Sequence, residues 1–256
     1  MIPRLHPGIL TLPLAHRALH DVTDGRPENS LSAIEAAIAH GYGVEIDLQL
    51  SADGQAMVFH DDALDRLAEG AGPVRARTAE DLGQITLLGG AEGVPTLRAV
   101  LDFVAGRVPL LIEIKDQDGA MGPNIGALEK AAVADLTGYT GPFGLMSFNP
   151  HSVAFMAELM PHAPRGLVSS SYDPAKWHPL PAAVCDALRP IADFERTKSS
   201  FISHEVADLS NPRVAELKNA GADVLCWTVK TADEERIARD VAQNITFEGY
   251  LAQHGS

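Results

Sequence analysis

Short strand-like runs alternate with helix-like stretches along most of the chain, and this alternation limits the possible folds more than any other feature. The strand-like runs are apolar, and turn-forming residues separate them from segments with helical spacing. The expected strands are residues 13–16, 44–50, 57–60, 110–115, 144–148, 166–169, 201–203, 224–229 and 245–247. The expected helices are residues 31–40, 97–104, 125–136, 151–160, 181–188, 213–219 and 232–241. This order predicts an α/β fold with a parallel sheet.

The length of the chain favours a closed barrel over an open sheet. A (β/α)₈ barrel, the TIM-barrel architecture, needs about 250 residues and eight strands, and the chain has 256 residues. A doubly wound open sheet is the alternative, but it would need a glycine-rich loop after its first strand. The segment that follows Leu14 runs from Ala15 to His20 and contains no glycine. We therefore expect one barrel domain over residues 1–256.

The charge balance excludes several classes of partner. Lys and Arg number 20 and Asp and Glu number 34, which gives a net charge of −14. Such a chain repels polyanions, so we expect no nucleic-acid partner and no binding to anionic membranes. No apolar run exceeds the stretch at residues 153–157, whereas a spanning helix needs roughly 18 apolar residues, so we expect no stable membrane insertion.

The N-terminal residues and the cysteines favour a cytoplasmic location. The first residues lack the long apolar stretch and the small-residue cleavage site of a secretory signal. Cys226 lies in an apolar run typical of a buried thiol, and Cys185 is the only other cysteine. We therefore expect two reduced cysteines in a reducing compartment.

Two expected strands carry charged residues where parallel strands, buried on both faces, are usually apolar. Glu45 and Asp47 alternate with aliphatic residues in one strand, and Glu113 and Lys115 do so in the other. Since side chains alternate between faces, all four can point into the barrel. Either strand alone could instead be a solvated sheet edge, but the two together indicate a site. Three neighbouring carboxylates predict a hard divalent cation, while Lys115 offsets charge and can hold a phosphate.

Two histidines end strand-like runs, which is where barrel enzymes build their active sites. His16 is followed by Arg17, and His60 is followed by an acidic pair. Imidazole can donate or accept a proton near neutral pH, so the pair indicates acid–base chemistry on a phosphate ester. His20 and His204 are weaker candidates for the rim of the site.

The residues described above belong to an ordered set of motifs that resembles the pattern of the glycerophosphodiester phosphodiesterase family, within the superfamily of phospholipase-C-like phosphodiesterases. The motifs are His16-Arg17, Pro27-Glu28-Asn29-Ser30, Glu45-x-Asp47, Asp53-Gly54, His60-Asp61 and Glu113-x-Lys115, followed by Ser147-Phe148 and Trp227-Thr228-Val229. Each motif alone is weak, but the ordered set is specific and spans nearly the whole chain.

The resemblance implies a (β/α)₈ barrel with one divalent cation, Mg²⁺ or Ca²⁺. It implies hydrolysis of a small glycerophosphodiester to glycerol 3-phosphate and an alcohol. Carried over by position, the general acid and base are His16 and His60, the metal ligands are Glu45, Asp47 and Glu113, and the phosphate-binding residues are Arg17 and Lys115. Glu28 and Asn29 support the site, and Trp227 either packs against the glycerol or belongs to the core.

The chain departs from the family pattern at four places. Ala18 stands where glycine is usual, extra residues lie near 19–26, Leu67 replaces a threonine after Arg66, and Glu248 lies in the segment where Thr-Asp-x-Pro is usual. None of these removes a proposed catalytic group. A related lysophospholipase-D-like or phospholipase-C-like enzyme, or a barrel that binds metal or phosphate without catalysis, remains the alternative, and the motifs leave the head group and the oligomeric state open.

Overall fold

Eight parallel strands form a closed ring in the computed structural model, which describes residues 2–254. The ring strands are β1 (Leu14–Ala15), β2 (Gly43–Leu50), β4 (Leu110–Ile114), β5 (Phe143–Ser147), β6 (Arg165–Ser169), β7 (Phe201–Glu205), β8 (Asp223–Val229) and β9 (Asn244–Phe247). Neighbouring strands follow chain order, with β3 left out of the ring, and β1 pairs with both β9 and β2, which closes it. The expected (β/α)₈ barrel is confirmed.

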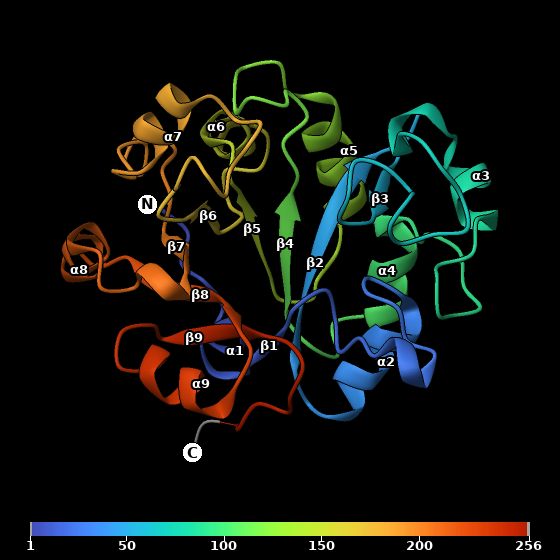
Figure 1. Ribbon diagram of the computed structural model, residues 1–256, viewed down its shortest axis with the longest axis horizontal. Coiled ribbons are helices and arrows are strands. Elements are labelled where there is room, and N and C mark those ends of the chain that lie inside the picture. Colours follow the sequence, from blue (N-terminus) through green and yellow to red (C-terminus); the bar gives the residue numbers. More distant parts are fainter. Residues whose placement is uncertain (1, 255–256) are drawn as a thin grey trace.

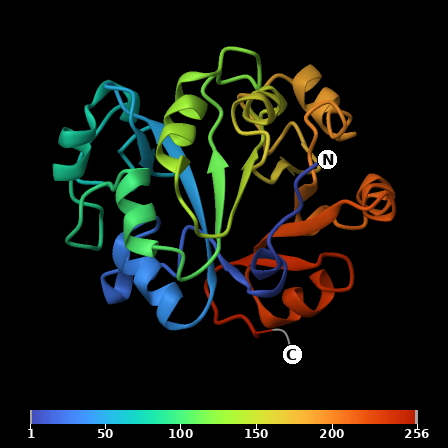
Figure 2. The same ribbon diagram turned by 180° about the vertical axis from the view of Figure 1, so that it is seen from behind.

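Helices follow seven of the ring strands and surround them (Figures 1 and 2). They are α2 (Leu31–Ala39), α4 (Leu97–Val104), α5 (Ala127–Leu136), α6 (Pro150–Leu159), α7 (Ala182–Leu188), α8 (Pro212–Asn219) and α9 (Ala232–Ala238). Three 3₁₀ turns lie at Val22–Asp24, Val74–Ala76 and Val206–Asp208. Asn149 and Asn211 each cap a helix that begins with proline, which suits the first helical position because proline has no N–H to satisfy.

Alternate residues of each strand divide the core into two parts. Val44, Ile46 and Leu48 of β2 belong to the large core shared with the surrounding helices. The interior of the ring holds a smaller cluster that consists of Leu5, Ile9, Leu14, Leu111, Met146, Val168, Phe201 and Leu225. Because side chains alternate between faces, Glu45 and Asp47 of the same β2 strand face the interior.

The expected strand at residues 57–60 is not a barrel strand. The structure places β3 at Ala56–Val58, antiparallel to β2 and outside the ring. Two apolar runs separated by a tight turn form a hairpin, and a hairpin cannot supply a parallel neighbour. β3 instead opens an insertion, residues 51–96, which includes α3 (Ala79–Gln84) and has its own small core. Because the chain turns back here, residues that follow β3 return to the barrel beside β2.

The sequence did not predict α1 (Pro7–Thr11), which precedes the first strand. Ile9 of this helix is fully buried in the interior cluster, together with Leu5. Asn244 of β9 holds the segment in place, because its Nδ2 donates to the carbonyl oxygens of Ile9 at 2.7 Å and Leu12 at 2.6 Å. The N-terminal segment thus supplies apolar side chains to the barrel interior.

Cys185 and Cys226 are both buried free thiols. No helix among residues 2–254 combines the length and the apolar character needed to cross a membrane.

We predict that Asn244→Ala lowers the free energy of unfolding by about 1–3 kcal/mol, because a buried carbonyl oxygen of Ile9 and a partly buried one of Leu12 lose their donor. Urea denaturation followed by circular dichroism would measure the change, with the exposed Asn219→Ala as the matched control. An Asn244→Ala variant as stable as the control would contradict this role for the amide.

Candidate active site

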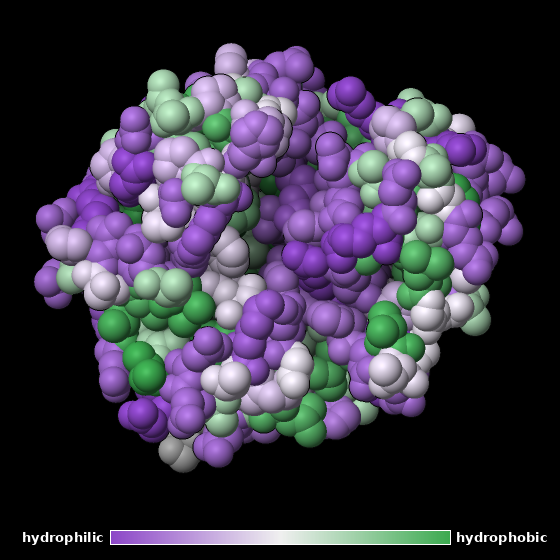
Figure 3. All heavy atoms as spheres, viewed as in Figure 1, coloured by the Kyte–Doolittle hydropathy of each residue, from purple (hydrophilic) through white to green (hydrophobic). Residues whose placement is uncertain are grey.

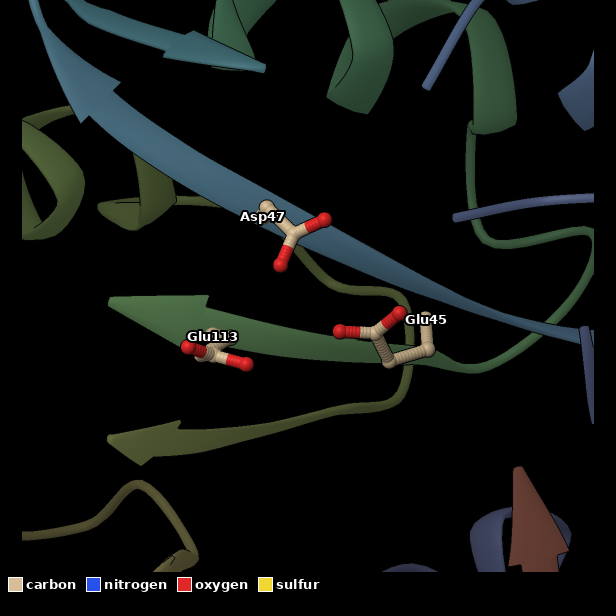
Figure 4. A group of neighbouring side chains, drawn as sticks. All are labelled: Glu45, Asp47 and Glu113. Atoms are coloured by element: carbon tan, nitrogen blue, oxygen red, sulfur yellow. The ribbon is translucent and has the colours of Figure 1, made fainter. Parts of the chain in front are cut away.

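Neighbouring strands β2 and β4 bring three carboxylates together inside the barrel. Asp47 lies opposite Glu113 in the parallel register, and Glu45 lies two residues earlier on β2. One carboxylate oxygen from each residue lies within 4.8 Å of the others, and Figure 4 shows the three side chains pointing toward one another. Their residues are only 2%, 1% and 6% exposed, in chain order. Water therefore screens their mutual repulsion poorly.

Lys115 compensates part of this charge. Its Nζ lies 2.8 Å from Asp47 Oδ1 and 2.9 Å from Glu113 Oε1. Burial raises the pKa of Asp47, but Lys115, His60 and Arg17 outweigh burial and hold this pKa well below its usual range. For Glu45, burial and the charges of Asp47 and Glu113 raise the pKa well above its usual value. For Glu113, burial raises the pKa against the opposing effect of Lys115.

The donor set is compatible with a divalent metal site. Glu45 lies in no ion pair with a lysine, arginine or histidine of residues 2–254, and no well-directed hydrogen bond from that range reaches Asp47 Oδ1. Carboxylate oxygens are the ligands preferred by hard divalent cations. The site therefore offers oxygen ligands and a deficit of positive charge at one place.

The loop after β1 carries His16 and Arg17 to the same place. The backbone N–H of Arg17 donates to Glu45 Oε2 at 3.0 Å. Arg17 and Ala18 have φ angles of 52° and 66°, so the chain makes a left-handed turn here. The glycine usual after His-Arg would adopt this turn freely, while Ala18 adopts it at a conformational cost.

Glu28 and Asn29 lie later in the same loop, and each binds a charged residue of the site. The Arg17 guanidinium donates to Glu28, and its Nε lies 3.7 Å from Asp47 Oδ2. Asn29 Nδ2 donates to Asp47 Oδ2 at 2.9 Å. Both residues therefore orient side chains of the acidic and basic cluster.

A carboxylate that the sequence did not identify orients His16. Glu248 Oε2 lies 2.6 Å from His16 Nδ1, and Lys230 Nζ lies 2.8 Å from the other oxygen of Glu248. The hydrogen bond from His16 is the main reason that the pKa of Glu248 lies far below its usual value. Burial lowers the pKa of His16, and the Glu248 carboxylate partly offsets this. Strand alternation was the available signal, because Asn244 and Thr246 share one face of β9 and Glu248 continues that alternation one residue beyond the end of the strand.

His60 has a corresponding carboxylate. Its Nδ1 lies 2.6 Å from Asp61 Oδ1, and Arg66 donates to both oxygens of Asp61 at 2.7 Å. Burial raises the pKa of Asp61, but the hydrogen bonds from His60 and Arg66 outweigh it and lower this pKa strongly. Arg66 is a second supporting residue that the sequence motifs did not identify.

Both histidines line one cavity that has a charged side and an apolar side. The lining residues are His16, Arg17, Glu45, His60, Glu113, Lys115, Met146, Phe148, Val168, Trp227, Thr228 and Thr246. Figure 3 views the molecule from the same side as Figure 1 and shows a hollow near its centre, with hydrophilic residues gathered along one side. Trp227 packs edge-on against Phe148 with ring centroids 5.4 Å apart, and its Nε1 donates to Ser203 O. Trp227 is therefore part of the cavity wall.

The two weaker histidine candidates have different surroundings. His20 Nε2 lies 3.8 Å from Glu248 Oε2, at the edge of the site. His204 shares the outward face of β7 with Ile202, and its ring lies between Ser169 Oγ and Asp208. The expectation that His204 lies at the rim was wrong, because the alternation along β7 turns it away from the interior.

Comparison with known proteins supports one family. A sequence model of the glycerophosphoryl diester phosphodiesterase family matches residues 16–244. The glycerophosphodiester phosphodiesterase of Caldanaerobacter subterraneus is 27% identical over 238 residues, which is 90% of each chain.

Solved structures share the fold. A phosphodiesterase of Oleispira antarctica, determined in complex with its product sn-glycerol-3-phosphate, is 24% identical with a TM-score of 0.74 and 93% coverage of each chain. A glycerophosphodiester phosphodiesterase of Agrobacterium tumefaciens is 24% identical with a TM-score of 0.67, covering 93% of this chain and 96% of that one. The family match covers most of the chain, so the protein belongs to the glycerophosphoryl diester phosphodiesterase family.

Proposed function

We propose that this protein hydrolyses small glycerophosphodiesters to glycerol 3-phosphate and an alcohol in the cavity at the carboxyl ends of the strands. The observation that carries the proposal is the pairing of two histidines with two carboxylates around one cavity. The same cavity contains Arg17, Lys115 and two members of the acidic cluster. The family membership and the name of the Caldanaerobacter relative support this substrate class.

Each histidine has one ring nitrogen engaged by a carboxylate. Since His16 and His60 use Nδ1 for Glu248 and Asp61, their Nε2 atoms are available to the substrate. One histidine removes a proton from the attacking water as the new phosphorus–oxygen bond forms. The other protonates the leaving alcohol oxygen as the ester bond breaks, so protons and bonds balance. General acid–base catalysis requires this placement of two groups at one phosphate.

Charged residues around the histidines bind the phosphate and the metal. Arg17 and Lys115 donate to the nonbridging phosphate oxygens, which gives the negative diester a local positive contact in an acidic protein. Glu45, Asp47 and Glu113 would hold one divalent cation, Mg²⁺ or Ca²⁺, which would supply positive charge to neutralise the phosphate.

The apolar side of the cavity suits the glycerol moiety. Trp227 and Phe148 line the cavity together with Met146 and Val168, and their two rings pack edge-on. A barrel that only binds phosphate would have no need for two histidines each held by a carboxylate, so the geometry favours hydrolysis over binding alone.

We predict that His16→Ala and His60→Ala each lower kcat by roughly 10²–10⁴-fold, because each removes a proton-transfer group. Release of glycerol 3-phosphate from glycerophosphocholine measures the change. The exposed His162→Ala is the matched control. Near-wild-type turnover by either site variant would contradict the two-histidine mechanism.

We predict that EDTA abolishes turnover and that Mg²⁺, Ca²⁺ or Mn²⁺ restores it. Glu45→Gln should weaken metal binding at least about 10-fold by calorimetry, since it removes one carboxylate ligand. The exposed Glu216→Gln serves as the control. Turnover that is indifferent to chelation would contradict the metal assignment.

We predict that Glu248→Gln shifts the limb of the kcat/KM–pH profile governed by His16 to lower pH. The Glu248 carboxylate raises the pKa of His16 by stabilising the imidazolium, whereas a neutral amide cannot. The proton of His16 therefore leaves at lower pH, whether this histidine is the acid or the base. A profile that is unchanged, or that moves to higher pH, would count against the Glu248–His16 pair.

A further inference from the structure

One arginine of the insertion binds two separate carboxylates of the site. Arg66 Nε and Nη2 donate to the two oxygens of Asp61, each at 2.7 Å, and its Nη1 donates to Glu28 Oε1 at 2.7 Å. The Arg66 side chain is 51% exposed, while those of Asp61 and Glu28 are 23% and 10% exposed. The guanidinium therefore bridges two partly buried anions at the edge of the cavity.

Each of these carboxylates supports a different group. Asp61 holds His60 through Nδ1 at 2.6 Å, and Glu28 Oε2 accepts from the Arg17 guanidinium. His60 and Asp61 belong to the insertion, whereas Arg17 and Glu28 belong to the loop between β1 and α2. A continuous series of charged hydrogen bonds thus connects the histidine on one segment with the arginine on the other.

The bridge requires the shape of arginine. A guanidinium presents five N–H donors in a rigid plane and can bind two carboxylates at once. A lysine ammonium has the same charge but lacks this fixed fork, so it cannot reproduce the geometry at both Asp61 and Glu28. Without a shared cation the two carboxylates would also repel each other.

The support of His16 is separate from this bridge. Glu248 and Lys230 hold that histidine from the opposite end of the chain. Contacts other than Arg66 also hold the insertion against α2, because Glu92 accepts from the backbone N–H groups of Leu31 and Ser32 at 3.0 Å. Loss of the Arg66 guanidinium should therefore leave the fold and His16 in place.

We propose that Arg66 is a positioning residue that fixes His60 relative to Arg17, and so couples proton transfer to phosphate binding. This inference rests on the proposed hydrolysis of glycerophosphodiesters. Because the bridge acts on both groups, one substitution at Arg66 should change turnover through His60 and substrate affinity through Arg17.

The test compares Arg66→Gln and Arg66→Lys with Arg77→Gln, an exposed arginine of the same insertion. We expect both Arg66 variants to lower kcat by about 10- to 100-fold, because small misplacements of a catalytic group have effects of this size. We also expect a severalfold rise in KM and weaker calorimetric binding of sn-glycerol 3-phosphate, with a melting temperature close to that of the wild type. Arg77→Gln should match the wild type in all four measurements.

Double-mutant cycles separate the effect of the Arg66–Asp61 contact from that of the Arg66–Glu28 contact. If Arg66 acts through Asp61, then Arg66→Gln adds little to the loss of kcat in Asp61→Asn. If it acts through Glu28, then it adds little to the weaker sn-glycerol 3-phosphate binding of Glu28→Gln. Full additivity in both cycles, wild-type kinetics in Arg66→Gln, or full rescue by Arg66→Lys would overturn the inference.

The measurement of sn-glycerol 3-phosphate binding distinguishes this inference from the proposed function, because binding does not require hydrolysis. A wild-type chain that binds sn-glycerol 3-phosphate but hydrolyses no glycerophosphodiester would contradict the proposed function. The Arg66–Glu28 cycle on binding would then still support or overturn the link to Arg17. A wild-type chain that hydrolyses the diester while Arg66→Gln is unaffected would overturn the inference alone.

Discussion

Three carboxylates buried beside one another inside a barrel are the constraint to which the rest of the site responds. Glu45, Asp47 and Glu113 are nearly inaccessible to solvent, so their repulsion must be relieved by cations held close by. Lys115 lies between two of them, and Arg17 approaches from the loop after β1. Glu45 still lacks a cationic side-chain partner among residues 2–254, and this deficit of positive charge makes the cluster compatible with a divalent cation.

The same need to neutralise charge explains why a protein of net charge −14 can act on a phosphate ester. The acidic surface repels polyanions at long range. At short range, the side chains of Arg17 and Lys115 place positive charge inside the cavity. Two carboxylate-supported histidines line the same cavity, one held by Glu248 directly after β9 and the other by Asp61 of the insertion. Through Asp61 and Glu28, Arg66 connects His60 of the insertion with Arg17 of the loop after β1, so the barrel and its insertion contribute to a single site.

Much of this arrangement could be predicted from residue order. The alternation of apolar and charged residues in two strands placed the acidic cluster and Lys115, because a strand has only two faces. The prediction went wrong at β3, since an apolar run looks the same whether it pairs in a parallel ring or in a hairpin. The position of His204 was also wrong, because its neighbours along the chain do not reveal which face of β7 is buried in the ring. The segment α1 carries too few residues for a helical period to be recognised.

The sequence by itself determined the barrel, the family and the set of chemical groups, because these depend on local periodicity and on motifs with short spacings. Only the tertiary structure decided which carboxylate orients which histidine. Glu248 is 232 residues from His16, and Arg66 is 38 residues from Glu28. Such pairs form because ring closure and the insertion bring distant segments together, and no local pattern records a contact between side chains so far apart in the chain. A charged side chain can contact only groups within a few ångströms, so the fold determines its partner by deciding which groups lie that close.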